Sequence, residues 1–360
     1  MKKIGILTSG GDCAGLNAVL HAVTCRAIHG YGWEVYGIRQ GTLGLLRRPI
    51  EAERLTENSF KPPIPRMGGT ILGTTNKGDP FAFPMDDGHI HDRSTEFAAG
   101  CRELGLDALI GVGGDGSMNI LRKLATQGNI KFIGIPKTID NDISMTENSI
   151  GFQTAVDIAT EALDRLQPTA ASHDRVMILE VMGRDAGHIA LSAGIAGAAD
   201  VILVPEIPYK LETVAARLKK HLQNGHNFAL VVVAEAVKTE NGEKVQIKDL
   251  TGKARFGGIG HYLADRLSAL TGAETRFTVL GHVQRGAQPN ASDRLLAAAF
   301  GVHAVDLIAE GKTDRMVAWQ NRRVIDVSLN DAIENYGAID THGTLIQTAR
   351  GMNICLGDES

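Results

Sequence analysis

The chain has 360 residues, a formal net charge of −4 at pH 7, and 43% hydrophobic but only 5% aromatic residues. This length exceeds what one ordinary core needs and suits two lobes. The near balance of 37 basic and 41 acidic residues gives no electrostatic reason to expect nucleic acid or a membrane surface as a partner. We find no apolar run of about 18 residues in the sequence, so we expect a cytoplasmic protein without a membrane span.

Short β-branched runs alternate with longer amphipathic stretches, which predicts an α/β protein. The expected strands are Lys3–Leu7, Glu34–Ile38, Ala108–Val112, Phe132–Ile135, Val176–Val181, Val201–Val204, Ala229–Ala234 and Phe277–Leu280. The expected helices are Ala18–His29, Ser117–Gln127, Thr154–Gln167, Ala186–Gly197, Leu211–Gln223, Ile259–Leu270 and Leu295–Glu310. Short connections and right-handed crossovers then give two lobes with parallel sheets and with the active-site loops at the carboxyl ends of the strands.

The lobes are expected to exchange segments. One junction is expected near Asn148–Gly151, and the chain is expected to cross back around Gly281. This predicts one lobe from residues 1–150 plus about 284–335, and a second from residues 151–283 plus about 336–360. Residues 60–92 are rich in proline, glycine and polar residues and predict loops and short turns.

Two glycine-rich segments each follow a predicted strand and precede a predicted helix. The first is Ser9-Gly10-Gly11-Asp12, and the second is GVGGDGS, residues 111–117. Glycines in this position let backbone amides close around a phosphate, and the positive end of the following helix adds attraction. A tight turn without a ligand is an equally good interpretation of the first segment alone. In the second, Asp115 is suited to hold Mg²⁺ through its water shell.

The second segment also satisfies the GxGxxG spacing of dinucleotide-binding proteins. That interpretation requires an acidic residue at the end of the next strand, about 20 residues further on, for the ribose hydroxyl. The next predicted strand instead ends at Gly134-Ile135-Pro136-Lys137. The sequence therefore disfavours a nicotinamide cofactor.

A third polar segment, Thr138-Ile139-Asp140-Asn141-Asp142, follows that strand. Two carboxylates at a spacing of two, beside two phosphate loops, suit a general base with a supporting acid. In phosphoryl transfer the protein mainly positions the reactants, while one carboxylate accepts the proton of the attacking hydroxyl. Such a pair is also common in ordinary surface loops, and its position after a third strand is what favours catalysis.

Polar residues also end several strands in the second half of the chain. They include the segment Met182-Gly183-Arg184, then Glu235, Arg276, His282 and Arg285. Arginines and a histidine at strand ends predict a pocket for an anionic phosphate ester. For any single arginine, a salt bridge across a domain seam is an equal alternative.

Together these segments resemble the phosphofructokinase family, and the resemblance covers nearly the whole chain. It rests on LTSGGDCAGLN, GVGGDGS, PKTIDNDI, SHDRV, EVMGRDAG, VPE, VVVAE, ETRFTVLGHVQRG and SDRLLA, which occur in the family's order. The resemblance implies two similar three-layer α/β lobes with mainly parallel sheets and an active site in the cleft between them. It also implies an allosteric homotetramer in which each sugar-phosphate site borrows arginines from a neighbouring subunit.

The resemblance implies a role for each matching residue. Asp140 is expected to be the general base on the 1-hydroxyl of fructose 6-phosphate, and Asp115 is expected to bind Mg²⁺. The other catalytic positions are Lys137, Thr138 and Asp142. The donor, ATP, is expected to contact Gly11, Asn76, Lys77, Gly114, Gly116 and Ser117. Fructose 6-phosphate is expected to contact Thr138, Asp140, Met182, Gly183, Arg184, Glu235, His282 and Arg285, with Arg175 and Arg276 reaching its 6-phosphate from the adjacent subunit.

The chain departs from the family pattern at positions that bear on the donor. Asn76, beside Lys77, stands where the nucleotide-using bacterial members usually have an arginine. Lys137 matches the pyrophosphate-dependent members, whereas the ATP enzymes commonly have glycine there. Gly116 points the other way, because pyrophosphate-dependent members usually carry an aspartate there that repels a nucleotide α-phosphate. We expect ATP as the donor, with pyrophosphate as the alternative.

Two further points concern regulation. His21, Cys25, His226 and Asn227 stand where the bacterial effector site has arginines and lysines, so regulation through that pocket is expected to be weak or altered. A non-catalytic regulatory homologue is the remaining alternative. It would be expected to lack Asp140 or Asp115, and this chain has both.

Overall fold

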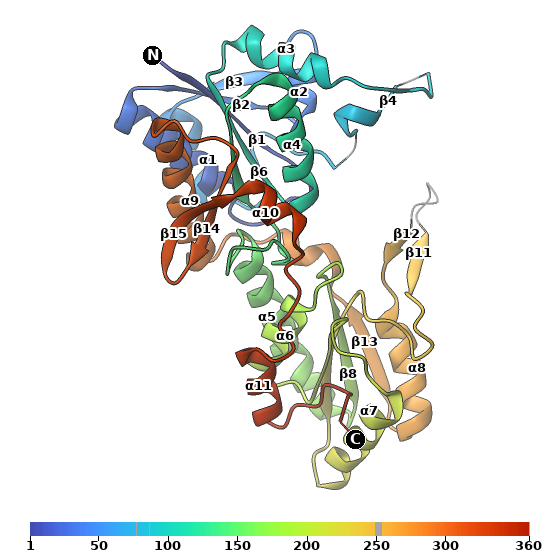
Figure 1. The fold of residues 1–360 in the computed structure, drawn as a ribbon. Coiled ribbons are helices and arrows are strands. Elements are labelled where there is room, and N and C mark those ends of the chain that lie inside the picture. The colour runs from blue at the N-terminus through green and yellow to red at the C-terminus, as the bar shows by residue number, and fades with distance from the viewer. Residues whose placement is uncertain (77, 86, 249–253, 360) are drawn as a thin grey trace. The chain divides into compact units, whose positions relative to one another are not determined.

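The computed structural model describes residues 1–76, 78–85, 87–248 and 254–359, and the chain divides into two compact α/β units (Figure 1). Unit 1 comprises Met1–Ile139, Ile143–Thr154 and Arg285–Tyr336. Unit 2 comprises Asp140–Asp142, Ala155–Gln284 and Gly337–Ser360. In the described part of the chain, no helix is both long enough and apolar enough to span a membrane.

Unit 1 is built on a seven-stranded sheet of order β15-β14-β7-β6-β1-β2-β3. The five inner strands run parallel, and the edge strands β3 and β15 pair antiparallel with their neighbours. The strands are β1 (Lys3–Thr8), β2 (Glu34–Ile38), β3 (Ala52–Leu55), β6 (Ala108–Gly113), β7 (Phe132–Pro136), β14 (Arg315–Gln320) and β15 (Arg323–Ser328). Every residue of β6 and β7 is buried, as expected for parallel strands covered on both faces.

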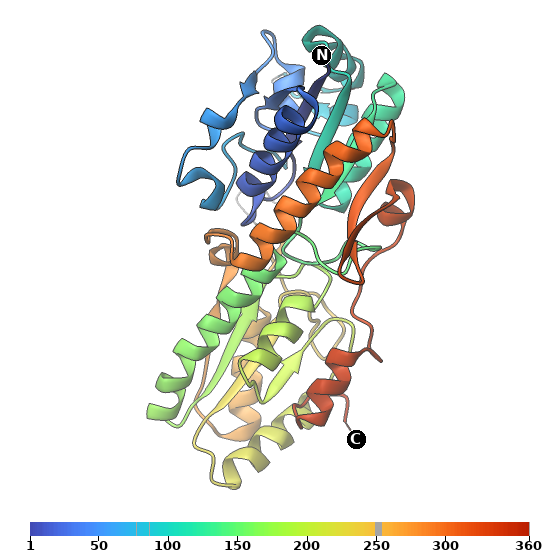
Figure 2. The same ribbon diagram turned by 90° about the vertical axis from the view of Figure 1, so that its left-hand side faces the viewer.

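Helices cover both faces of this sheet. On one face, α1 (Leu16–Cys25) packs along α9 (Ala291–Ala309), as Figure 2 shows. A Cβ at Gly301 would lie 2.8 Å from the Cβ of Ala22, so glycine is what permits this close approach. On the other face, α3 and α4 cover a core that includes Phe97, Leu121 and Phe132. Helix α3 spans Ser94–Leu104 and α4 spans Asp115–Gly128, and the unit also contains η1 (Arg26–Gly30), α2 (Leu43–Leu46) and α10 (Leu329–Glu334).

Unit 2 contains a four-stranded parallel sheet of order β13-β8-β10-β9. Its strands are β8 (Val176–Val181), β9 (Val201–Leu203), β10 (Ala229–Ala234) and β13 (Thr275–Val279). Helices α7 and α8 lie on one face, and α5, α6 and α11 lie on the other (Figure 1). The helices are α5 (Phe152–Ser172), α6 (His188–Ala196), α7 (Leu211–Gln223), α8 (Ile259–Thr271) and α11 (Thr344–Gly351). A hairpin of β11 (Gln246–Lys248) and β12 (Ala254–Phe256) completes the unit.

The eight expected strands and seven expected helices are all present, four with the predicted bounds (β2, β8, β10 and α7) and the others with shifted ends, and the α/β prediction is confirmed. The predicted end of one helix at Gln167 is wrong, because α5 continues through Pro168 to Ser172. Proline removes the bond to the carbonyl four residues earlier, at Asp164, but both residues are exposed and water can solvate that carbonyl. The described residues between 60 and 92 form only short elements, as predicted: the end of η2 (Glu57–Phe60), η3 (Ile64–Arg66), η4 (Pro80–Ala82), β4 (Phe83–Pro84) and β5 (Ile90–His91).

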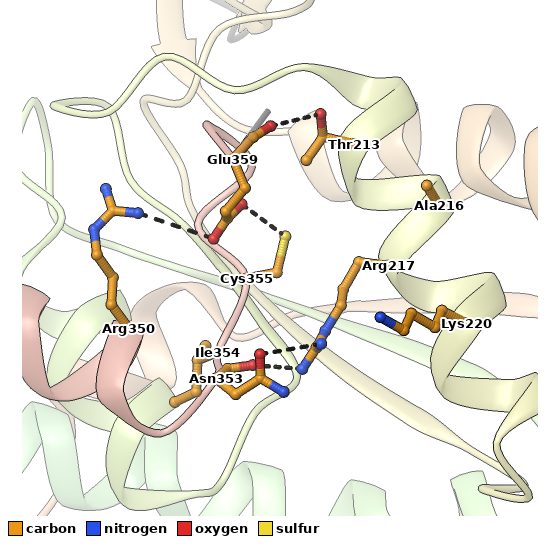
Figure 3. A pocket seen from close by; sticks show the side chains of 9 residues that line it. All are labelled: Thr213, Ala216, Arg217, Lys220, Arg350, Asn353, Ile354, Cys355 and Glu359. Carbon is orange, nitrogen blue, oxygen red and sulfur yellow. Dashed lines mark hydrogen bonds and ion pairs between the residues drawn. The ribbon is translucent and has the colours of Figure 1, made fainter.

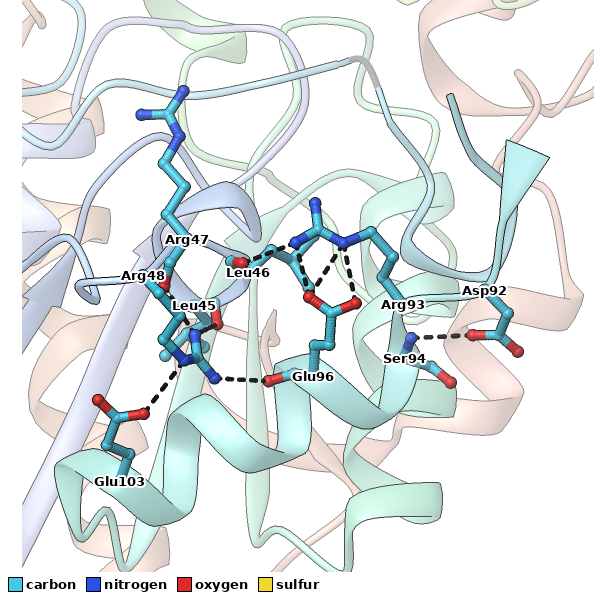
Figure 4. Close-up of polar contacts among 9 residues, drawn as sticks. All are labelled: Leu45, Leu46, Arg47, Arg48, Asp92, Arg93, Ser94, Glu96 and Glu103. Atoms are coloured by element: carbon cyan, nitrogen blue, oxygen red, sulfur yellow. Dashed lines mark hydrogen bonds and ion pairs between the residues drawn. The ribbon is translucent and has the colours of Figure 1, made fainter. Parts of the chain in front are cut away.

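The sequence did not predict α3 or the β14–β15 hairpin. The hairpin loop consists of Asn321 and Arg322, with φ of 49° and 62°, which fits a type I′ turn without the glycine that usually announces one. Helix α3 begins where the Asp92 carboxylate accepts a hydrogen bond from the Ser94 amide at 2.8 Å (Figure 4). Arg93 then ties this turn to α2 through the Leu46 carbonyl at 2.8 Å.

Candidate active site

In unit 1, three polar loops meet at the carboxyl ends of β1, β6 and β7. These strands are neighbours in the sheet and run parallel, so their ends lie at one edge. The Ser9 amide donates to the Val112 carbonyl at 2.9 Å, which joins the first loop to the second. The Lys137 amide donates to the Gly113 carbonyl at 2.9 Å, which joins the third loop to the second. These two hydrogen bonds hold the starts of the three loops together at this edge of the sheet.

Glycine is required where the first two loops approach each other. Gly10 has φ of 82°, and a Cβ there would lie 2.9 Å from the Ser117 hydroxyl. A Cβ at Gly113 would lie 2.7 Å from the Cβ of Ser117, in the same segment. A side chain at Gly10 would push the first loop away from the second, and one at Gly113 would collide with the first turn of α4.

Helix α4 begins at this surface. Gly114 is its N-cap residue and makes no side-chain capping bond, and Asp115 is its first residue. The first-turn amides of a helix have no partner within the helix and carry partial positive charge, so they can bind a phosphate. A Cβ at Gly116 would have no atom within 4 Å, which leaves open space beside these amides.

The Lys137 side chain is 4% exposed and reaches back under the first loop. Its ammonium nitrogen donates to the Ser9 carbonyl at 3.0 Å and to the Gly11 carbonyl. The neighbouring Thr138 is also buried, and its carbonyl accepts from the Ser149 hydroxyl at 2.7 Å. Burial raises the pKa of the adjacent Cys13 thiol to about 12, so this cysteine is protonated despite the lysine charge.

Arg285 lies in unit 1, beside the first loop. Its Nη1 donates to the Asp12 carbonyl at 3.0 Å, and a Cβ on Gly11 would come within 2.9 Å of the same nitrogen. Asn76 is exposed and follows Thr75, whose carbonyl accepts from the Gly10 amide at 2.9 Å. Lys77 lies outside the described residues. The structure thus brings Arg285 and Asn76 to the same loop as Gly11.

Asp115 is the carboxylate expected to hold Mg²⁺. Among the described residues, no set of three His, Cys, Asp or Glu side chains is arranged to hold a metal ion by itself. Mg²⁺ commonly keeps several waters and is bound by one or two carboxylates together with substrate phosphates. A single aspartate at the start of α4, beside amides suited to a phosphate, fits that manner of binding.

In unit 2, Asp140 and Asp142 are 2% and 1% exposed. Nη1 of Arg184 lies 3.3 Å from Oδ2 of Asp142, so one predicted sugar-phosphate residue is paired with one predicted catalytic residue. Arg184 has φ of 51°, and it follows Gly183, where a side chain would collide with the Ala186 carbonyl. The turn after β8 is therefore shaped to direct this arginine.

Glu235 follows β10 and supports the same turn. Its Oε1 accepts from the Gly183 amide at 3.2 Å and from the Arg184 amide at 3.0 Å. Burial raises the pKa of the Glu235 carboxyl to about 7, and the charge of Asp140 adds to the rise. The two amide bonds oppose it. Ionisation of Glu235 near neutral pH is thus coupled to the charge on the predicted general base.

A cavity of about 580 Å³ in unit 2 brings Met182, Glu235 and His282 together. Glu180 also lines it, and sequence reasoning missed this residue. Its carboxylate is 1% exposed and accepts from the Gly258 amide at 3.2 Å and the Gly260 amide at 2.8 Å, at the start of α8. The available signal was a single acid inside the apolar strand segment VMILEV.

Arg175 and Arg276 share one carboxylate. Nη2 of Arg175 lies 2.9 Å from Oε1 of Glu274, and Nη2 of Arg276 lies 2.6 Å from the same oxygen. The hydrogen bond from Arg175 holds the pKa of Glu274 below its usual value. The two arginines therefore form a paired anion site that Glu274 fills.

The positions expected for effector binding are engaged in local contacts. His21 packs against Phe60 with ring centroids 5.3 Å apart, and burial lowers its pKa, so it is mostly neutral. The rings of His226 and His221 stack with their centroids 4.0 Å apart. Asn227 donates to the Asp174 carboxylate at 3.1 Å.

Comparison with known proteins adds to this geometry. The family model described as Phosphofructokinase matches residues 3–308. A Synechocystis protein named ATP-dependent 6-phosphofructokinase 1 is 59% identical over 359 residues, which cover 100% of this chain and 99% of that protein. A Nostoc protein of the same name is 60% identical over 357 residues, covering 99% of each. Phosphofructokinase from Saccharomyces cerevisiae is similar in structure, with a TM-score of 0.78 and 28% identity over 98% of this chain and 47% of the yeast chain.

Proposed function

Because this chain belongs to the phosphofructokinase family, we propose that it transfers the γ-phosphate of ATP to the 1-hydroxyl of fructose 6-phosphate. The observation that carries this proposal is the identity of 59% and 60% to relatives named ATP-dependent 6-phosphofructokinase, over essentially the whole chain. The products are fructose 1,6-bisphosphate and ADP. The reaction is a step of glycolysis, which fits a cytoplasmic enzyme.

Unit 1 binds the donor in this proposal. The phosphates lie on the backbone amides around Gly11, Gly114 and Ser117, at the positive end of α4. Asn76 supplies a polar contact at the edge of the first loop. Mg²⁺ bound by Asp115 and the donor's own oxygens would neutralise charge on the transferring phosphate.

Unit 2 binds the sugar phosphate and supplies the base. The carboxylate of Asp140 accepts the proton of the 1-hydroxyl as that oxygen attacks the γ-phosphorus and the ADP oxygen leaves. Asp142 holds Arg184 through the 3.3 Å ion pair, and this positions the guanidinium for an anionic substrate. The other residues proposed to contact the sugar phosphate are Thr138, Met182, Gly183, Glu235, His282 and Arg285.

Two observations favour ATP over pyrophosphate. Gly116 leaves open space beside the α4 amides, where an aspartate would present a negative charge to a nucleotide phosphate. The Lys137 ammonium donates to the carbonyls of Ser9 and Gly11, so it supports the loop in addition to any contact with a donor. Lysine at this position is therefore compatible with a nucleotide.

We also propose a homotetramer with shared sites. Arg175 and Arg276 form a pair around Glu274, and the 6-phosphate of a substrate bound at a neighbouring subunit's site would compete with Glu274 for that pair.

The test of the proposed function is a coupled assay of fructose 1,6-bisphosphate formation with ATP, ADP and pyrophosphate offered separately. Rapid product formation with ATP alone is expected. Activity with pyrophosphate and none with ATP would contradict the donor assignment.

A further inference from the structure

Unit 2 contains a second hollow, of about 500 Å³, that shares no residue with the cavity at Glu235 (Figure 3). One wall is a stripe of α7, because Thr213, Ala216, Arg217 and Lys220 follow the i, i+3, i+4, i+7 spacing of one helix face. The other wall is the end of the chain, from Arg350 to Glu359. The volume is within the range of small-molecule sites.

The chain end forms a fixed wall. Cys355 makes a parallel bridge with Val201 at the edge of the sheet, and its carbonyl accepts from the Ile202 amide at 2.9 Å. The Arg350 guanidinium binds both carboxylate oxygens of Asp358, at 3.0 and 2.6 Å. A ligand would therefore find this hollow already formed, which lowers the entropic cost of binding.

The two cations of the α7 stripe have no acidic partner in the part of the chain that the structure describes. Arg217 donates from Nη1 to the side-chain oxygen of Asn353 at 3.3 Å and from Nη2 to the Asn353 carbonyl, both neutral acceptors. Its buried Nε has no hydrogen-bond partner among the residues that the structure describes. Within the same described ranges, neither Arg217 nor Lys220 has a carboxylate within 4.0 Å, whereas Arg350 pairs with Asp358.

Like charges three residues apart on one helix repel each other, and an anion between them removes that repulsion. Glu359 is the single acid lining the hollow among the described residues, and its carboxylate already accepts from the Leu356 and Gly357 amides at 3.0 Å each. Arginine and lysine together are suited to a phosphate group. Ala216 and Ile354 add an apolar surface next to them.

We propose that this hollow binds a small phosphate monoester, with its phosphate at Arg217 and Lys220 and its carbon skeleton against Ala216 and Ile354. Because the hollow shares no residue with the cavity at Glu235, the ligand would bind in addition to the substrates and act as an effector. The proposal does not depend on which donor the enzyme uses.

The test is calorimetric titration of the full-length enzyme with glycerol 3-phosphate and, separately, with inorganic phosphate. Fructose 6-phosphate is left out because it is itself a phosphate monoester, and ionic strength is held constant; the comparison of variants below separates the hollow from the substrate site. We expect the wild-type enzyme to bind both, the ester more tightly. Lys220→Ala should weaken binding at least about tenfold. Lys219→Ala is the matched control, since Lys219 is an exposed lysine of α7 that does not line the hollow.

Arg217→Ala distinguishes ligand binding by Arg217 from a purely structural role, in which Arg217 only stabilises the fold. Arg217→Ala would then lower the unfolding temperature without changing the affinity of the ester in the folded protein. Equal affinities for the Lys220→Ala and Lys219→Ala enzymes, or no binding to wild type at millimolar ester, would overturn the proposal. Binding of inorganic phosphate without the ester would overturn the assignment of an organic ligand.

Discussion

The ammonium nitrogen of Lys137 lies 3.0 Å from the carbonyl oxygen of Ser9, so a side chain from the end of β7 holds the loop that follows β1. The same nitrogen donates to the Gly11 carbonyl. A buried ammonium is costly unless hydrogen bonds compensate it, and here the bonds fix the shape of a loop proposed to hold phosphates. Lys137, which by sequence resembles the pyrophosphate-dependent members, thus stabilises the first loop in this chain.

Lys137→Met keeps the length of the side chain and removes its charge. Because two loop carbonyls lose their donor, we expect the KM for ATP to rise several-fold and stability to fall by about 1–3 kcal/mol. Steady-state kinetics and denaturant unfolding measure the two effects. A changed ratio of the activity with ATP to the activity with pyrophosphate, at unchanged stability, would show that Lys137 selects the donor directly.

Gly116→Asp tests the space beside the start of α4. We expect kcat/KM for ATP to fall by at least about 10²-fold, which corresponds to roughly 2.7 kcal/mol of lost transition-state binding. Gly116→Ala is the matched control. A Cβ there meets no atom within 4 Å, so alanine should leave the rate nearly unchanged. A similar loss in both variants would point to the backbone and not to charge.

Asp140→Ser removes the proposed general base. We expect kcat to fall by about 10²–10⁴-fold, with little change in the affinity for fructose 6-phosphate, since a general base contributes on that scale. Binding of fructose 6-phosphate, measured separately, serves as the control for folding. A variant that keeps more than about a third of the wild-type kcat would rule out this role.

The sequence predicted the parallel-strand framework because short apolar runs such as Ala108–Gly113 and Ala229–Ala234 alternate with longer amphipathic stretches, which favours buried strands. The family segments also placed the loops in the right order along the strand ends. Contacts between distant residues could not be predicted. Two examples are the hydrogen bond from Lys137 to the Gly11 carbonyl and the one from the Arg184 amide to Glu235. The positions of these residues along the sequence do not predict either contact, because each depends on which strands are neighbours in the sheet. Sequence analysis did not identify Glu180 as a site residue, because a single acid inside an apolar strand has no evident role until its hydrogen bonds to backbone amides are known.

The raised pKa of Glu235, about 7, has a consequence for stability. In the unfolded chain this carboxyl titrates near 4.5, so the folded protein binds more protons between pH 4.5 and 7. Stability from this group is therefore fully present below pH 4.5 and is lost as the pH rises to 7. Glutamine does not ionise, so the Glu235→Gln variant should not lose this stability. The difference in unfolding free energy between the variant and the wild type should therefore shift in favour of the variant by about 1–3 kcal/mol from pH 5 to pH 7.5. Parallel pH profiles for the two proteins would contradict the raised pKa.

Arg175 and Arg276 lie around the single carboxylate of Glu274, and we propose that they serve the sugar-phosphate site of a neighbouring subunit. Alanine at either position should raise the KM for fructose 6-phosphate strongly, because a desolvated phosphate loses a charge-assisted partner. The decisive measurement mixes Arg276→Ala subunits with Asp140→Ser subunits after dissociation and reassembly. In a hybrid, a site can combine the intact Asp140 of the first subunit with the intact Arg276 of the second. Activity above the sum of the two parent enzymes is then expected, while activity equal to that sum would show that each site uses arginines from its own chain.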